Sequence, residues 1–317
     1  MSQAAKLTYR GWPNCYCLWN DSVELVVTTD VGPRIVRFGF TGENEFGEFP
    51  EHSGQTGGDE FRLYGGHRLW HAPESLERTY CPDNAPVELE RLADGVRITQ
   101  PIESRTGIQK EITISFAPVD AHVHVVHRLW NRNLWAVDLA AWALTVMAPG
   151  GTAVIPLPPR LPYPEGLLPT GQLALWPYTD PADPRWCWGR RYILLHQDAT
   201  RPSPQKLGAS VPDGWIAHVR NERLFVKTFR YIVGEKYPDL GSAVETFTDG
   251  RMLELETLSP IARVEPGGVI EHVENWYLWR DVAVPRGDDD VDRVILSKLK
   301  ALHTEASRHS DLPGPHL

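Results

Sequence analysis

The stretch 252-MLELETLSPIARVEPGGVIEHVENWYLW-279 decides the fold of this chain. Polar and apolar residues alternate over 252–258, and a longer run rich in β-branched and aromatic residues covers 269–278. Between these runs, 266-PGG-268 marks a turn, because proline and glycine supply backbone conformations that other residues avoid. The stretch therefore predicts two β-strands joined by a turn, and no helix.

The same signals extend over most of the 317 residues. Asp94-Gly95 and Asp249-Gly250 are typical of tight turns between antiparallel strands. Further strands are expected at 23–28, 34–40, 87–92, 96–101, 108–116, 122–130, 137–147, 192–196, 215–219, 224–233 and 243–248. Strands at this spacing, without helical patterns between them, predict an all-β protein built as a large antiparallel sandwich or barrel.

Two segments depart from this pattern. After Asp288, apolar residues recur at helical spacing, which predicts one C-terminal helix over 287–309 with a tail at 310–317, beside a single β domain over 1–286. The segment 156–184 contains nine prolines and little alternation. Such a segment is either a strap over a sheet edge or a lid over a site, and we favour the strap.

Composition limits the function. Thirty-two basic and 41 acidic side chains leave a net charge of −9, which argues against a nucleic-acid partner. The sequence has no apolar run of membrane-spanning length and no secretory signal. Its four cysteines are too sparse for a disulfide framework, so we expect free thiols in the cytosol.

The alternation over 252–258 assigns two glutamates to one strand face. Leu253, Leu255 and Thr257 share one face, whereas Met252, Glu254 and Glu256 share the other. Two carboxylates about 7 Å apart repel each other and are tolerated where water, a cation or a ligand meets them. This face is therefore either a solvated outer surface or the wall of a cleft in which one glutamate acts as a general base.

Histidines and lysine on two other strands offer weaker signals. His122 and His124 share a face that His127 does not, and no third ligand follows at a fixed spacing, so we expect no metal. Lys227 projects among aromatic residues. It either pairs with a carboxylate or extends to the sheet edge, and we favour the second interpretation.

The segment 64-YGGHRLWHAPE-74 is the densest cluster of functional groups, and we expect it to be a loop at the rim of a cleft. Gly65 and Gly66 permit close backbone approach. His67 and His71 flank Trp70, whereas phosphate-loop, serine-hydrolase and zinc-protease motifs are lacking. Arg34 follows a Gly-Pro turn, where its planar group of donors can bind hydroxyls.

Four stretches together resemble the galactose-mutarotase-like superfamily, which includes aldose 1-epimerases. They are 32-GPRIVRFGF-40, 65-GGHRLW-70, 125-VVHRLWNRNLWAVDLAAWALTVMAPGG-151 and the opening stretch. The segment at 65–70 is similar to that of a branch of unknown function with a GGH-x-x-W sequence. The resemblance covers roughly 14–280 and implies a large antiparallel β-supersandwich with a sugar site on its concave face.

The resemblance also implies roles for individual residues. Glu256 falls where the family has its base, and His67 or His71 would be the acid. Trp70, Trp142 and Arg34 would position the ring. The remaining residues expected to contact substrate are Arg62, His127, Lys227 and Glu254. No cofactor is implied, and the partner is a small sugar or oligosaccharide.

One departure leaves the activity open. Mutarotases have a second histidine on a middle strand, whereas 138-DLAAWALTVM-147 offers Trp142 instead. The first hypothesis is an aldose 1-epimerase-like enzyme, and the alternative is a non-catalytic sugar-binding or sensing domain. A third is a polysaccharide lyase or glycoside hydrolase that uses Glu254 and Glu256.

Overall fold

The computed structural model describes residues 3–117 and 121–302 and contains two large antiparallel sheets. The first sheet has the spatial order β1 (Gln3–Tyr9), β2 (Trp12–Trp19), β3 (Val23–Thr28), β4 (Arg34–Phe40), β5 (His67–Ala72), β10 (Val137–Met147), β19 (Leu253–Leu258), β18 (Val244–Thr248), β15 (Gln205–Ala209) and β12 (Leu173–Leu175), and β20 (Ala262–Val264) pairs with β10. The second has the order β13 (Trp186–Trp188), β14 (Tyr192–His196), β11 (Thr152–Pro156), β16 (Trp215–Arg220), β17 (Arg223–Phe229), β21 (Val269–Trp279), β9 (His122–Asn131), β8 (Ile108–Phe116), β7 (Gly95–Thr99) and β6 (Glu88–Arg91). The protein is therefore an all-β sandwich, as the sequence predicts.

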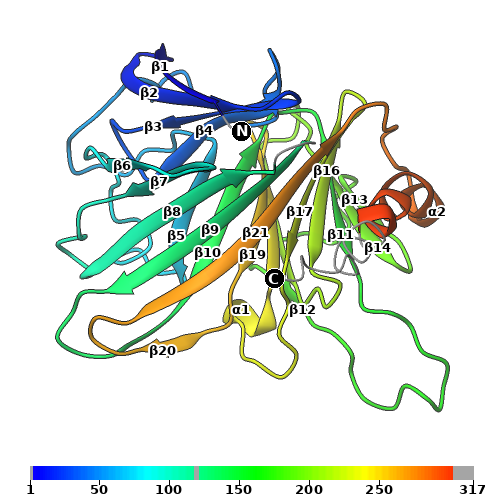
Figure 1. The fold of residues 1–317 in the computed structure, drawn as a ribbon. Coiled ribbons are helices and arrows are strands. Elements are labelled where there is room, and N and C mark those ends of the chain that lie inside the picture. Colours follow the sequence, from blue (N-terminus) through cyan, green and yellow to red (C-terminus); the bar gives the residue numbers. More distant parts are fainter. Residues whose placement is uncertain (1–2, 118–120, 303–317) are drawn as a thin grey trace, which may run out of the picture.

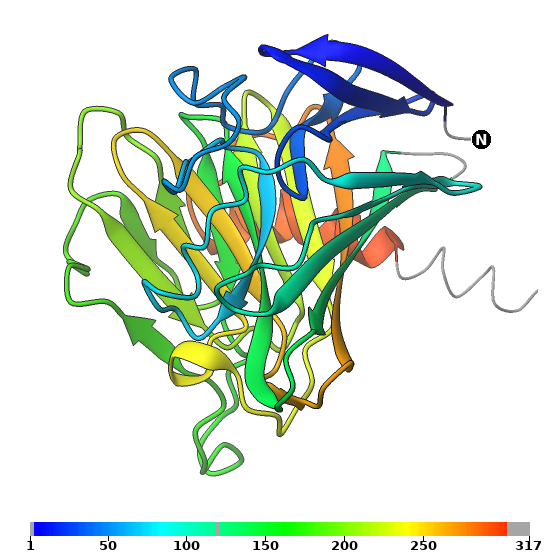
Figure 2. The same cartoon turned by 90° about the vertical axis from the view of Figure 1, so that its left-hand side faces the viewer.

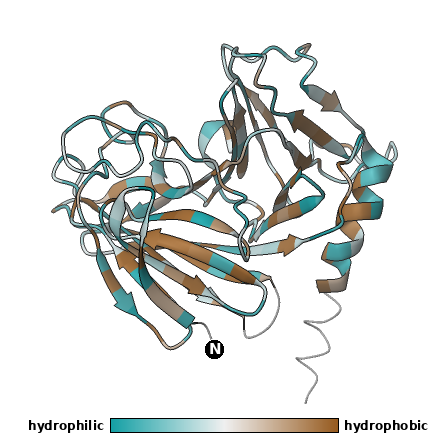
Figure 3. Cartoon of the chain, turned by 90° about the horizontal axis from the view of Figure 1, so that it is seen from above, coloured by the Kyte–Doolittle hydropathy of each residue, from teal (hydrophilic) through white to brown (hydrophobic). Residues whose placement is uncertain are grey.

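The two sheets form layers, with β9 and β21 packed over β10 (Figures 1 and 2). Hydrophobic and hydrophilic bands alternate along many strands, because successive side chains point to opposite faces (Figure 3). Between the layers, four aromatic rings pack with centroids 5.5–6.0 Å apart: Phe38, Phe46, Phe225 and Trp276. This apolar core fixes which face of each strand points inward.

Sequence patterning locates most strands. The bounds of β3, β4, β8, β10 and β14 match the expected ranges residue for residue. The segment 64–74 is different: the expectation of a loop is wrong, because residues 67–72 form β5 between β4 and β10. Gly65 and Gly66 lie at positive φ immediately before β5, and a Cβ on either would collide with backbone of a neighbouring segment.

The proline-rich segment contributes a strand at a sheet edge. Residues 173–175 form β12, which pairs with β15 at the end of the first sheet. This part of the segment acts as the expected strap. The preceding residues extend away from the sheets (Figure 1), and Tyr163 and Leu168 on them are exposed.

Helices are few in the described chain. At the C-terminus, α2 (Asp288–Val291) continues into a π-helical turn, η1 (Asp292–Leu296), and residues 297–302 remain helical. This helix packs on the second sheet through Val291, Ile295 and Leu299. The expected continuation over 303–309 and the tail at 310–317 lie outside the described residues. A short segment, α1 (Pro238–Gly241), contains non-helical dihedrals. No helix in the described ranges combines the length and apolar character needed to cross a membrane.

Candidate functional site

A pocket of about 190 Å³ lies on the face of the first sheet that points away from the second sheet. Its wall comes from β5, β10, β15, β18 and β19 and from four connecting segments. The lining residues are Phe61, Leu63, Arg68, Trp70, Glu74, Tyr80, Trp142, Leu144, Tyr178, Lys206, Phe247, Met252, Glu254 and Glu256. Its volume is below that of pockets for drug-sized ligands, so it suits one small ring.

Strand register aligns the charged residues of this pocket. Arg68 is paired with Leu144, and Leu144 is paired with Glu256 on the next strand. Glu245 lies opposite Glu256 on the other side of β19. Because directly paired residues of antiparallel strands share a face, these side chains form one row across four strands. The row presents an arginine and a glutamate to the same pocket, separated by one leucine.

Met252, Glu254 and Glu256 share one face of β19 and its entry, as the alternation predicts, and all three line the pocket. Both glutamates line the pocket, and their exposed fractions are 6 % and 0 %. The solvated outer surface, one of the two alternatives left by the sequence, is therefore wrong. Leu255 and Thr257 point the other way, toward the second sheet.

Buried ion pairs hold these carboxylates. Arg68 Nη2 lies 3.2 Å from Glu254 Oε1, and Lys206 Nζ lies 2.8 Å from Glu245 Oε2 and 3.5 Å from Glu256 Oε2. The Trp142 indole N–H donates to Glu256 Oε2 at 2.8 Å. Among the residues that line the pocket, three buried atoms nevertheless have no hydrogen-bond partner: Arg68 Nε, Arg68 Nη1 and Glu256 Oε1. Oε1 of Glu245, which lies beside the pocket and does not line it, has none either. The pocket therefore offers two donors and one acceptor that the protein leaves unused.

Burial and neighbouring charges shift the pKa values in the pocket. Burial raises the pKa of Glu254 to about 7; Arg68 opposes the shift, and Glu256 reinforces it. Burial also raises the pKa of the Glu245 carboxyl well above its usual range. For Lys206, burial disfavours the ammonium, but Glu256 and Glu245 outweigh it and raise the pKa. Near neutral pH, a proton can therefore reside on a carboxyl in this site.

Aromatic rings enclose the charged row. Trp70 and Trp142 pack edge to face at 5.3 Å, and the Arg68 guanidinium lies 4.1 Å from the centre of the Trp70 ring. Lys206 Nζ lies 4.7 Å from the centre of the Trp142 ring and 4.6 Å from that of Trp176. Trp176 and the pocket residue Tyr178 belong to the proline-rich segment, which thus covers an edge and also borders the pocket.

Four of the ten residues expected from the sequence line this pocket: Trp70, Trp142, Glu254 and Glu256. His67 and His71 are wrong as acids for Glu256, because both point from β5 to the opposite face. His67 contacts Thr145 and His127 between the sheets. His71 is buried beside Glu103, 3.6 Å away.

The other four expected residues have different contacts. Arg34 lies in the same row as Arg68 but binds Gly65 O and Asp83. Arg62 donates to Gly57 O on a connecting segment. The expectation that Lys227 reaches the sheet edge is wrong: it is fully buried and lies 2.9 Å from Glu274 Oε1. His127 is also buried between the sheets, so neither residue lines the pocket.

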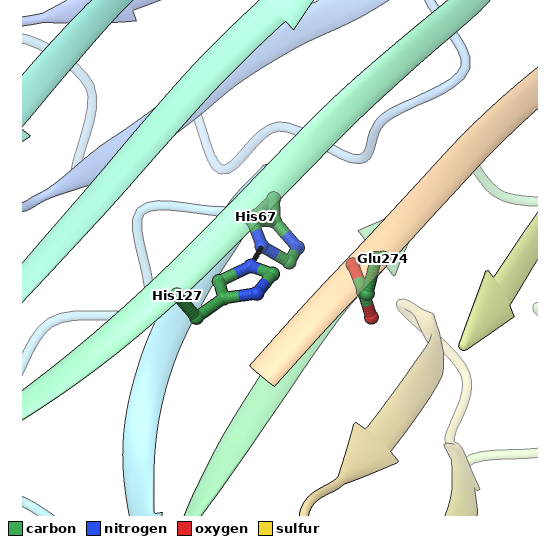
Figure 4. Close-up of side chains that lie close together, drawn as sticks. All are labelled: His67, His127 and Glu274. Carbon is green, nitrogen blue, oxygen red and sulfur yellow. Dashed lines mark hydrogen bonds between the residues drawn. The ribbon is translucent and has the colours of Figure 1, made fainter. Parts of the chain in front are cut away.

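A second polar cluster connects the two sheets behind the pocket (Figure 4). His67 and His127 point toward each other, with their Nε2 atoms 2.7 Å apart. Glu274 accepts hydrogen bonds from Lys227, Trp276 and Thr257. Burial favours the neutral form of Glu274, but the charge of Lys227 outweighs it and holds the pKa of Glu274 below its usual range. We call His67, His127, His272, Glu274, Lys227, Thr145 and Thr257 the inter-sheet network.

The hydrogen-bond partners of His67 and His127 determine which ring nitrogen of each histidine carries a proton. His127 Nδ1 faces a carbonyl oxygen, that of His272, and must donate, so the Nε2 atom of a neutral His127 accepts. His67 Nε2 therefore donates to it, and His67 Nδ1 accepts from the Thr145 hydroxyl. Every group has a partner without any added ion.

A metal ion fits this cluster poorly. The candidate ligands His67, His127 and Glu274 lie close enough to one another to share an ion. However, the Lys227 ammonium already neutralises Glu274 in this buried space. A divalent ion would add two uncompensated positive charges there, which low-dielectric surroundings penalise strongly.

Sequence reasoning missed Arg68, Lys206, Glu245 and the aromatic residues of the connecting segments. One signal was available for Arg68, because reading 67-HRLWHA-72 as a strand places Arg68 and Trp70 on the same face. Lys206 lies in the short β15, whose pattern gives no strong strand signal. Only the sheet order brings β15 beside β18 and β19.

Larger hollows occur elsewhere on the described chain. One of about 1110 Å³ is bordered by Arg191 and Asp288, which pair with each other, and one of about 590 Å³ lies beside the C-terminal helix. A third, of about 340 Å³, lies beside Asp83 and Glu103. Asp83 pairs with Arg34, and Glu103 pairs with Lys110. These named charged groups are paired within the protein, whereas Arg68 and Glu256 in the 190 Å³ pocket retain unpaired atoms.

The chain is a two-sheet antiparallel β-sandwich with an acidic, aromatic-walled pocket on one sheet. Its fold is similar to that of galactose mutarotase-like proteins of known structure. The structure is similar to a galactose mutarotase-like protein from Lactobacillus casei, at 9% identity and a TM-score of 0.51 over 84% of this chain and 100% of that one. The YeaD protein of Salmonella typhimurium, a candidate mutarotase, shares 10% identity over 84% of this chain and 90% of its own, with a TM-score of 0.55. Slr1438 of Synechocystis shares 12% identity over 87% of this chain and 99% of its own, with a TM-score of 0.55. No protein-family model and no curated protein sequence matches the chain.

Proposed function

We propose that this protein binds a single sugar ring in the 190 Å³ pocket and catalyses exchange of its anomers. The observation that carries the proposal is the set of unused hydrogen-bonding atoms on Arg68 and Glu256. Buried polar atoms without partners are costly, and a hydroxyl that accepts from Arg68 or donates to Glu256 relieves that cost. A sugar ring carries several such hydroxyls, and its C–H faces suit the rings of Trp70 and Trp142.

Glu256 is the proposed base. Its Oε2 is held by Trp142 and Lys206, whereas Oε1 is free to take a proton from a ligand hydroxyl. A general base must lie within hydrogen-bond reach of the proton that it removes, and a buried carboxylate facing a pocket meets this condition. The galactose-mutarotase-like fold supports the same assignment by analogy.

The experiment is a comparison of wild type with Glu256→Gln. Thermal shift and calorimetry with a panel of aldoses measure binding, and saturation-transfer NMR measures anomer exchange. We expect at least one aldose to bind and its anomers to exchange faster with wild type than with Glu256→Gln. The absence of binding by every sugar contradicts the proposal.

The second candidate is a non-catalytic sugar sensor, which the lack of a pocket histidine in the described chain favours. Binding without exchange would support it. Release of reducing ends from oligosaccharides would instead indicate glycoside cleavage. We further propose a reducing compartment such as the cytosol, because all four cysteines are free thiols.

A further inference from the structure

Resting on the proposed exchange of anomers, we propose that Glu254 is the proton donor of this site and works as a pair with Glu256. The donor is the group left unassigned once His67 and His71 point away from the pocket. No histidine lines the pocket in the ranges that the structure describes. Tyr80, Tyr178 and Lys206 also line the pocket, but their surroundings raise the pKa of each above its usual value, so a carboxyl group gives up its proton more readily.

The geometry brings the two carboxyls to one ligand. Glu254 and Glu256 project from the same face of β19, about 7 Å apart along the strand, and both line the pocket. Pairs of carboxyl groups also act on either side of a sugar in glycosidases. Here the two groups would flank the anomeric carbon, with one on the ring oxygen and the other on the hydroxyl.

The surroundings of the two glutamates differ. Glu256 accepts a hydrogen bond from the Trp142 indole N–H and lies 3.5 Å from the Lys206 ammonium. Glu254 is paired across the strands with Val146 and Phe247, and its cation partner is Arg68. Burial in this setting raises the pKa of Glu254 to about 7, so a large share of the molecules carry a proton there at neutral pH. Different environments for two carboxyls are the usual basis for separate acid and base roles.

The step conserves protons and electrons. Glu254 gives its proton to the ring oxygen as the bond from that oxygen to the anomeric carbon breaks, and the bonding electron pair stays on the oxygen. Glu256 takes the proton of the anomeric hydroxyl, whose oxygen forms the carbonyl of the open chain. After rotation, the reverse transfers close the ring on the other face and restore both carboxyls. The free N–H groups of Arg68 can stabilise the oxygen that gains electrons.

The test compares Glu254→Gln, Glu254→Asp and the control Glu265→Gln, whose carboxylate lies in an exposed turn. Glu254→Gln keeps an acceptor for Arg68 but has no proton to give. We expect kcat to fall about 100-fold or more, with the affinity for the sugar within about five-fold of wild type. In wild type, kcat should decrease as the pH rises through about 7, because the donor must be protonated. Glu254→Asp should retain this pH dependence at a lower rate, and Glu265→Gln should match wild type.

Three results overturn the inference. A Glu254→Gln enzyme with more than a tenth of the wild-type kcat shows that another group donates, and the proposed function survives. A wild type that binds sugar without exchanging its anomers removes the donor role while leaving a sugar-binding site. A wild type that binds no sugar overturns the proposed function together with the inference.

Discussion

Both faces of β5, β10 and β19 carry buried polar groups, but the two faces differ in how completely those groups are hydrogen-bonded. On the face toward the pocket, Arg68 and Glu256 retain buried atoms without partners. On the opposite face, the inter-sheet network pairs every ring nitrogen of His67 and His127 and both oxygens of Glu274. Both faces are buried, so solvent does not explain the difference.

The difference separates a binding role from a structural role. A buried polar atom without a partner costs about 1–3 kcal/mol, and such a cost persists where a ligand repays it. A fully paired network has nothing left to offer a ligand, but it ties the two sheets together at one place. Histidines and charged residues in a core therefore indicate function only where their hydrogen bonding is incomplete.

Removing Lys227 should produce the largest effect. Lys227→Met leaves Glu274 charged and unpaired between the sheets, and we expect the free energy of unfolding to fall by about 3–5 kcal/mol. Urea denaturation measures the change. Lys227→Met/Glu274→Leu removes both charges and should recover much of the loss. A single variant as stable as wild type would show that the pair is unimportant.

Removing Arg68 should weaken ligand binding more than folding. Arg68→Met deletes the two unused donors and leaves Glu254, which can take up a proton because its pKa is already about 7. We expect the Kd for the sugar to rise about 10- to 100-fold, or about 1.4–2.8 kcal/mol. Calorimetry gives the affinity, and urea denaturation should show a smaller loss than for Lys227→Met. The opposite ranking would contradict the division between the faces.

Sequence patterning predicts the fold well because alternation and turn residues are local signals. The stretch 252–279 reveals its two long strands and the turn before the second, but not the short β20 between them. The face that carries Glu254 and Glu256 follows from the alternation of side chains along a strand. The sheet order is not local. Nothing within 205-QKLGA-209 indicates that Lys206 lies beside Glu245 and Glu256.

The misassigned histidines have one cause. Two glycines before His67 and a proline after Ala72 suggest a loop, in which side chains can turn in any direction. In a strand, successive side chains point to opposite faces of the sheet. If Trp70 faces the pocket, Arg68 must face it too, and His67 and His71 must point to the other face. The family resemblance favours the same histidines, because a similar sequence motif indicates which residue types are present but not the sheet face to which each side chain points.

The two faces should respond to pH with opposite signs. Burial lowers the pKa of His272 to about 3, below its unfolded value, so its contribution to stability is complete above pH 6.5 and declines as the pH falls. Burial raises the pKa of Glu254 to about 7, so its contribution is complete below pH 4.5 and is lost as the pH rises to 7. Between pH 6.5 and 5.5 each group changes the stability by about 1 kcal/mol.

Two variants separate these contributions. From pH 6.5 to 5.5, wild type should lose about 1 kcal/mol relative to His272→Gln, which can still donate to Thr257. Over the same interval, wild type should gain about 1 kcal/mol relative to Glu254→Gln. Urea denaturation at the two pH values gives both differences. Differences of the same sign would contradict the assignment of the two faces.

Zinc should produce the smallest effect. His67 donates a hydrogen bond to His127, and Lys227 supplies the positive charge beside Glu274. A divalent ion would have to displace that hydrogen bond and would be repelled by the Lys227 ammonium. We therefore expect one equivalent of Zn²⁺, or an excess of chelator, to change the Tm by less than about 1 °C, because binding to the folded state alone would raise it. Atomic absorption after dialysis provides an independent measure. Retained zinc that is lost in His127→Asn would show that the inter-sheet network is incomplete without an ion, and the contrast between the two faces would then be one between two ligand sites.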